Sequence, residues 1–208
     1  MRGELTMKKI MFNDHYGLTT AVISGCKTQT RPIVPDKIIE DFEDKCDFDE
    51  LIPQGTRDKC FKAFALQYAP YKVGEIVAIA QQYSDNAVCD LLAPNVTEKD
   101  AWMIGFLMHS AGWENKMFVK ADLMPHQIKI IGVKVERLQD ISDEDCLAEG
   151  VIKYTNGVYT YIESGKKFFH RELDTPKKAF AALIDKINGK NTWERNPWVF
   201  AYSFTLIK

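Results

Sequence analysis

The sequence predicts one α+β domain, residues 1–208, in which helices flank a mixed β-barrel. The chain has the length of a single domain, and its 46% hydrophobic and 12% aromatic content is enough for a substantial core. Candidate strands and helices follow one another without a regular strand–helix–strand rhythm, which favours a mixed barrel over a doubly wound sheet. No internal repeat or low-complexity tract is visible.

A short amphipathic helix followed by an extended segment is expected near the N-terminus. Leu18, Ala21 and Val22 fall at i, i+3 and i+4, the apolar stripe of a helix. Gly25 suits the left-handed position just after a helix, because it has no Cβ to clash. Residues 28–31 alternate and precede a proline, so we expect them to be extended.

Two surface helices and a strand are predicted next. Residues 36–50 carry eight acids against two lysines above an apolar stripe, and a second stripe at 61–68 ends before Pro70. A solvated face over a core stripe accounts for both patterns, and the alternative for 36–50 is a contact surface for a protein partner. The turn signal at 72–75 precedes a buried strand expected over 76–83.

The middle of the chain predicts a helix and a long strand. Thr97 and Asp100 form a capping box for a helix that ends near Gly112. Residues 127–138 alternate apolar and polar side chains, and Gly132 breaks the phase of that alternation. The break predicts a β-bulge within the strand.

Turn and capping residues mark the elements of the C-terminal part. Ser142 is expected to cap a short helix that ends at Gly150. An Asn-Gly pair inside 154–162 indicates a hairpin. The clearest helix, over 175–189, has threonine at the N-cap, proline at the first helical position and glycine at its end. An aromatic strand over 198–207 closes the chain.

Charge and cysteine content restrict the function. The net charge of −2 excludes a globally basic nucleic-acid binder, so attraction for phosphate has to come from a local patch. We see no secretory signal and no run near the ~18 apolar residues of a membrane span. The five cysteines are widely spaced and form no CxxC pair. We therefore expect neither a zinc ribbon nor a disulfide framework, and a cytoplasmic location.

Common metal and nucleotide motifs are missing from the sequence. The four histidines form no HxH or HExxH pattern, so no metal site is expected. GxxxxGK[ST], GxGxxG and GxSxG do not occur, and the nucleoside-triphosphate, dinucleotide and serine-hydrolase interpretations lack their main signature. We expect no cofactor.

The first group that could carry chemistry is Lys27 with Thr30. They offer a possible base beside a possible nucleophile. A lysine acting as a base needs a pKa lowered by burial or by a cation, and Arg31 could supply the cation. Residues three apart in a straight strand point to opposite faces, so cooperation requires a twist, bulge or turn. The alternative is a solvated edge strand.

Two further groups come later in the chain. Glu149 lies at a helix end, where a carboxylate is unfavourable with the helix dipole, and this hints at another role. Residues 166–178 interleave basic and aromatic side chains, which suits phosphate attraction with base stacking. The alternative is aromatic residues in the core with lysines in water. The candidate ligand-binding residues of this segment are Lys166, Lys167 and Arg171.

Four sequence blocks occur in a characteristic order. They are GCKTQTR at 25–31, YKVGEIV at 71–77, VERLQDIS at 135–142 running on to AEG at 148–150, and WERNPWVF at 193–200. Together with Met124-Pro125-His126, these blocks resemble phage and bacterial proteins of the ASCH domain family, which belongs to the PUA-like superfamily. The resemblance spans most of the chain.

This resemblance implies a PUA-like β-barrel with a cleft beside the first helix, proposed to bind RNA or modified nucleosides. Some small family members are amidohydrolases that remove the acetyl group of N4-acetylcytidine. Their catalytic lysine, threonine and glutamate match Lys27, Thr30 and Glu149. Relative to the minimal domain, the segments 33–70 and 85–115 look like insertions.

A binding module is the first of two functional hypotheses. It would hold RNA or a modified nucleoside with Lys27, Thr28 and Arg31, and residues 166–178 would extend the surface. The family often shows V-R-E after its K-x-G-D turn, whereas Ile79-Ala80-Gln81 stands here and lacks both charges. For that reason we expect binding rather than catalysis.

An amidohydrolase is the second hypothesis. Thr30 would attack the carbonyl carbon of an N-acyl nucleoside, or position a water molecule there. Lys27 would take the proton, and Glu149 would protonate the leaving amine.

Overall fold

The computed structural model describes residues 7–45, 53–85, 105–164 and 173–207. The strands are β1 (Lys8–Ile10), β2 (Gln29–Thr30), β3 (Ile76–Ile79), β4 (Gln127–Arg137), β5 (Ile152–Lys153), β6 (Tyr159–Thr160) and β7 (Trp198–Leu206). The α-helices are α1 (Leu18–Ile23), α2 (Asp36–Lys45), α3 (Gln54–Gln67), α6 (Asp143–Ala148), α7 (Pro176–Asn188) and α8 (Thr192–Arg195). Short 3-10 turns are η1 (Asp14–Tyr16), η3 (Lys116–Phe118), η4 (Ala121–Leu123) and η5 (Leu138–Asp140). Strands and helices are mixed, which confirms the α+β class.

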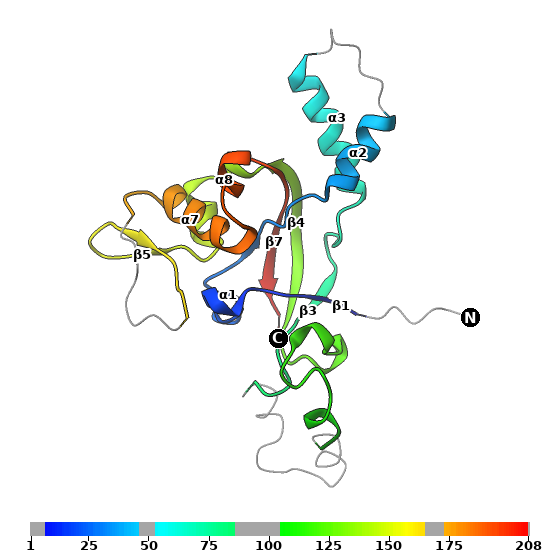
Figure 1. Ribbon diagram of the computed structural model, residues 1–208, viewed down its shortest axis with the longest axis vertical. Coiled ribbons are helices and arrows are strands. Elements are labelled where there is room, and N and C mark those ends of the chain that lie inside the picture. Colours follow the sequence, from blue (N-terminus) through cyan, green and yellow to red (C-terminus); the bar gives the residue numbers. More distant parts are fainter. Residues whose placement is uncertain (1–6, 46–52, 86–104, 165–172, 208) are drawn as a thin grey trace.

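The described strands form a five-stranded mixed sheet and a small separate hairpin. The order in the sheet is β1-β3-β4-β7-β2, with β1 and β3 parallel and the other pairs antiparallel. The long strands β4 and β7 run side by side through the centre of the molecule (Figure 1). Their register shifts between Ile130 and Gly132, so the predicted bulge is confirmed. The second sheet pairs β5 with β6.

The core lies mainly between this sheet and the helices that cover it. Phe200, Tyr202 and Phe204 of β7 are buried together with Leu18 and Val22 of α1 and with residues of α3 and β3. A second apolar cluster joins α7, through Ala179, Phe180 and Ile184, to η5 and α6. Since α1 and α7 both take part in these clusters, the core positions the two helices that border the site described below.

Capping residues account for several element ends. Thr175 accepts a hydrogen bond from the Lys178 backbone N–H and Pro176 begins α7, as predicted. Ser142 accepts from the Asp145 backbone N–H at the start of α6.

The strand expected over 76–83 ends at Ile79, because its partners β1 and β4 end at the same level of the sheet. The predicted cap of Thr97 and Asp100 lies outside the described residues.

The segment 33–70 contains α2 and α3, which lie at one end of the molecule, away from α1 and α7 (Figure 1). Phe42 of α2 packs edge-on against Phe61 of α3, with ring centroids 5.2 Å apart. One ion pair joins the two helices, since the guanidinium of Arg57 in α3 lies 3.7 Å from Glu43 in α2. Residues 46–50 of the predicted acidic helix lie outside the described part.

No helix among the described residues has the length and apolar character needed to cross a membrane.

The alternation of β7 predicts unequal costs for neighbouring substitutions. Phe204 is buried and Thr205 is exposed on the opposite face. Phe204→Ala should lower the free energy of unfolding by about 3–5 kcal/mol, because it removes a buried ring and leaves a cavity. Thr205→Ala is the control and should change it by less than about 0.5 kcal/mol. Urea denaturation measures both, and equal losses would contradict the assigned faces.

Candidate active site

The segment between α1 and β2 brings Lys27 close to the end of α6. Gly25, at a φ of +76°, turns the chain after α1 in the left-handed conformation expected of it. The Lys27 backbone N–H donates to Ala21 O at 2.8 Å, and the Thr28 N–H donates to Ala148 O at 2.9 Å. These bonds fix the segment between two helix ends, so the Lys27 side chain lies beside Glu149, the residue that follows α6.

Lys27 and Glu149 form a buried ion pair. Lys27 Nζ lies 2.5 Å from Glu149 Oε2 and donates to the Glu149 carbonyl oxygen at 2.9 Å. Only 2% of Lys27 and 5% of Glu149 is exposed. Gly150 has a φ of +104°, and a Cβ there would lie 3.2 Å from Leu18 Cδ2 and 3.8 Å from Lys27 Cδ. The tight turn after Glu149 therefore requires glycine.

Arg31 connects this pair to two further acids. Its Nη1 lies 2.8 Å from Glu149 Oε1, its Nη2 lies 2.7 Å from Asp145 Oδ2, and its Nε lies 3.1 Å from Glu136 Oε1. Burial alone would lower the pKa of Arg31, but the carboxylates outweigh burial and raise it. With every guanidinium nitrogen bonded, Arg31 holds the acids in place.

Burial changes the acid–base chemistry of Lys27. Removal from water lowers the pKa of the Lys27 ammonium, and the charge of Arg31 lowers it further. Glu149 acts in the opposite direction, but the lowering dominates. Lys27 can therefore lose a proton more easily than a lysine in water, as a general base requires.

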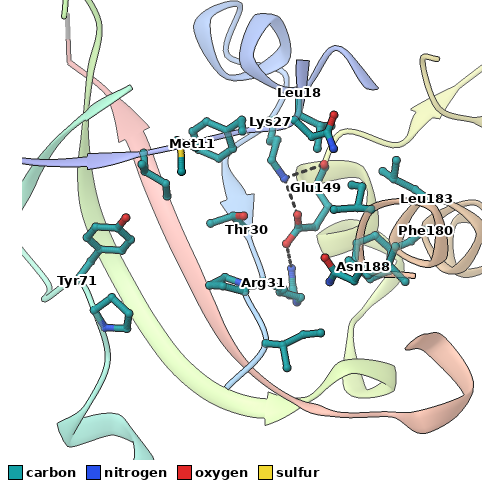
Figure 2. A pocket seen from close by; sticks show the side chains of 18 of the residues that line it. Met11, Leu18, Lys27, Thr30, Arg31, Tyr71, Glu149, Phe180, Leu183 and Asn188 are labelled. Carbon is teal, nitrogen blue, oxygen red and sulfur yellow. Dashed lines mark hydrogen bonds and ion pairs between the residues drawn. The ribbon is translucent and has the colours of Figure 1, made fainter. Parts of the chain in front are cut away.

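A cavity of about 480 Å³ opens beside the pair. Figure 2 shows the side chains of Lys27, Thr30 and Glu149 at its centre, with Leu183 and Phe180 of α7 on one side. Thr30 is half-buried, and within the described residues no hydrogen bond involves its hydroxyl. A cavity with an apolar wall and a few polar groups is typical of small-molecule sites.

The structure brings together four of the residues singled out from the sequence. Lys27, Thr30, Arg31 and Glu149 line the same cavity, because Lys27 lies in the turn before β2 and not in a straight strand. Thr28 is exposed and does not line the cavity. The remaining candidates lie outside the described residues: Lys166, Lys167 and Arg171.

Two site residues were missed at the sequence level, Glu136 and Asp145. The signal for Glu136 was an acid at a buried position of a long strand, where an acid needs a partner. Asp145 lies within the helix predicted to begin after Ser142, and nothing in that local pattern pointed to a contact with Arg31. In the described part of the chain, no group of three or more His, Cys, Asp or Glu side chains is arranged to hold a metal ion.

Comparisons with protein-family models, with curated proteins and with solved structures found no match to this chain.

Loss of the Arg31 guanidinium should destabilise the protein strongly. Arg31→Met leaves three carboxylates without their shared cation, and we expect a loss of about 3–5 kcal/mol at pH 7. Arg57→Met, at an exposed ion pair, is the control and should cost less than about 1 kcal/mol. Urea denaturation at pH 7 provides the measurement, and similar losses for the two variants would contradict this role.

Proposed function

We propose that the chain is an ASCH-type domain of the PUA-like superfamily whose cavity binds an N-acylated nucleoside and hydrolyses its amide bond. The observation that carries this proposal is the buried ion pair of Lys27 and Glu149 beside the unbonded hydroxyl of Thr30. The five-stranded mixed sheet is compatible with a PUA-like barrel. The resemblance of the four sequence blocks supplies the substrate class.

The size and charge of the cavity favour a neutral ligand in it. Its volume, about 480 Å³, lies within the range of small-molecule sites. Lys27 and Arg31, which line the cavity, are already paired with Glu136, Asp145 and Glu149. A phosphate would find no uncompensated positive charge beside these two cations, whereas a nucleobase could lie against the apolar wall of α7.

The ion pair can supply both the base and the acid of an amide hydrolysis. Transfer of one proton from Lys27 Nζ to Glu149 Oε2, across 2.5 Å, yields a neutral amine and a carboxylic acid together. The amine takes a proton from water, positioned by the Thr30 hydroxyl, as the water oxygen bonds to the acyl carbon. Glu149 then protonates the nitrogen as the carbon–nitrogen bond breaks. The products are a carboxylic acid and a free amine, and the ion pair is restored.

Thr30 can alternatively attack the acyl carbon itself. Lys27 would then take the Thr30 proton, Glu149 would protonate the leaving amine as the carbon–nitrogen bond breaks, and a water molecule would hydrolyse the resulting ester of Thr30 in a second step. In both routes Arg31 is a positioning residue, since it holds the second oxygen of Glu149 at 2.8 Å.

Residues 79–81, where the sequence differs from the family pattern, lie outside the cavity. Gln81 is buried and its Oε1 lies 2.8 Å from Nδ1 of His126, outside the cavity. Burial also lowers the pKa of His126. Because neither Ala80 nor Gln81 lines the cavity, the lost charges do not alter its lining. This favours hydrolysis over binding alone.

Substitution of the three central residues tests the proposal. Wild-type protein should release cytidine from N4-acetylcytidine, and Lys27→Met, Thr30→Ala and Glu149→Gln should each slow release by about 100-fold or more, since each removes a proton-transfer or positioning group. Chromatography of the reaction measures cytidine. Thr28→Ala, an exposed neighbour outside the cavity, is the matched control and should keep the wild-type rate.

Two outcomes would contradict the proposal. If wild-type protein retained the nucleoside without releasing cytidine, it would be a binding module. A Thr30→Ala protein with the wild-type rate would remove Thr30 from the mechanism. Thermal melting of each variant separates loss of chemistry from loss of fold.

The dependence of kcat on pH tests whether Lys27 and Glu149 share a mobile proton. The mechanism uses an ion pair that holds one mobile proton, so kcat should fall when alkali removes it. Since burial lowers the pKa of Lys27, the midpoint of this fall should lie below 10.5. Steady-state kinetics from pH 7 to pH 11 would show it. A kcat that stays constant or rises up to pH 10.5 would contradict the proposed role of the pair.

A further inference from the structure

A second, more open hollow of about 580 Å³ borders the cavity at Tyr71. Lys9, Pro70 and Tyr71 line both spaces, so the two are adjacent compartments. Lys8 and Val119 line only the second compartment. A ligand that fills the cavity therefore lies next to residues that also line this hollow.

Tyr71 is a rigid wall between the compartments. Its hydroxyl donates to Lys9 O at 3.0 Å, and its backbone N–H donates to the Tyr202 hydroxyl at 3.3 Å. Its ring packs edge-on against Tyr202 with centroids 5.5 Å apart. Figure 2 shows Tyr71 on the side of the cavity opposite Glu149 and α7. A fixed aromatic ring at this place suits the passage of a base or sugar from the reacting centre.

Two lysines line the second compartment, Lys8 and Lys9, and Lys9 also lines the cavity. Lys8 Nζ lies 2.9 Å from Glu75 Oε1 and 2.7 Å from Pro70 O, and half of its side chain is exposed. Lys9 Nζ donates to Met117 O at 2.6 Å and to Val119 O at 2.8 Å, which fixes its ammonium without neutralising it. The compartment thus has two ammonium groups in its lining, and only Lys8 is paired with a carboxylate among the described residues. Ammonium groups held in this way are suited to bind phosphate as point charges.

We propose that this compartment is a phosphate subsite, so that the substrate is a nucleotide and not a free nucleoside. The acylated base lies in the cavity near Lys27, the sugar passes Tyr71, and the phosphate reaches Lys8 and Lys9. The inference rests on the proposed function for the occupant of the cavity. A free nucleotide and a nucleotide within an RNA chain share this chemistry.

Calorimetric titration of full-length Thr30→Ala protein tests the subsite without turnover. The probes are N4-acetylcytidine and its 5′- and 3′-monophosphates, at 25 mM and 250 mM KCl. At least one monophosphate should bind about 5-fold or more tightly than the nucleoside at low salt, the size of one charge contact near the surface. The advantage should shrink at high salt because the lysines are partly exposed.

Three substitutions that remove a charge, each made in the Thr30→Ala protein, test which residue binds the phosphate. Lys8→Gln should remove most of the advantage of the monophosphate, and Glu75→Gln should increase it by releasing Lys8 from its ion pair. Lys37→Gln, an exposed position on α2 away from both compartments, is the matched control and should change nothing. Binding of the uncharged nucleoside should stay the same in all three.

The outcomes separate this inference from the proposed function. Equal affinity for the nucleoside and both monophosphates, or an advantage that survives Lys8→Gln, would overturn the subsite even if wild-type protein hydrolyses the nucleoside. A phosphate advantage that depends on Lys8 would establish the subsite even if no cytidine is released. A trinucleotide with central N4-acetylcytidine that binds more tightly than the monophosphates assigns an RNA chain as the source, and weaker binding assigns a free nucleotide.

Discussion

The site depends on the three ion pairs of one buried guanidinium. Arg31 follows β2, and its bonds reach Glu136 on β4, Asp145 in α6 and Glu149 after α6. Each of these acids would be costly to bury alone, and Arg31 would be costly to bury without them. The sheet and α6 can therefore pack together only with this arrangement intact. The same constraint fixes the carboxylate of Glu149 at the distance from Lys27 that proton transfer requires.

Stability alone is a poor explanation for so many buried charges. An apolar set of similar volume often gives a protein equal or greater stability than a buried ion pair. The exposed pair of Arg57 and Glu43 illustrates the usual arrangement, in which both charges remain in water. Lys27 and Glu149 are instead almost fully buried at the edge of a cavity. Since ionisable groups with shifted pKa values concentrate at functional sites, the lowered pKa of Lys27 favours a chemical role for this position.

The sequence predicted local features well and long-range contacts only in part. The caps of α6 and α7, the turn at Gly25 and the bulge at Gly132 depend on neighbouring residues, and all are present. The meeting of Lys27, Thr30 and Glu149 was expected from a resemblance, not from spacing, because the lysine and the glutamate lie 122 residues apart. The contribution of α7 to the cavity depends on how distant elements pack, and no local pattern identifies Arg31 as the partner of Glu136 and Asp145. The predicted strand over 76–83 was too long because its sheet partners end near Ile79, which the local sequence does not show.

Burial lowers the pKa of Lys27, and it also affects which nearby side chain could act as the nucleophile in the proposed hydrolysis. Cys146 in α6 is fully buried near the same acids, and burial raises the pKa of its thiol to about 12. A thiol with such a pKa stays protonated and behaves as an apolar side chain, so it is a poor nucleophile. The Thr30 hydroxyl, by contrast, lines the cavity with Lys27 and Glu149. A hydroxyl needs a base to react at neutral pH, and the buried lysine is the group that can provide one. In the proposed mechanism the candidate nucleophile is therefore the Thr30 hydroxyl, or water that it positions, and not the Cys146 thiol.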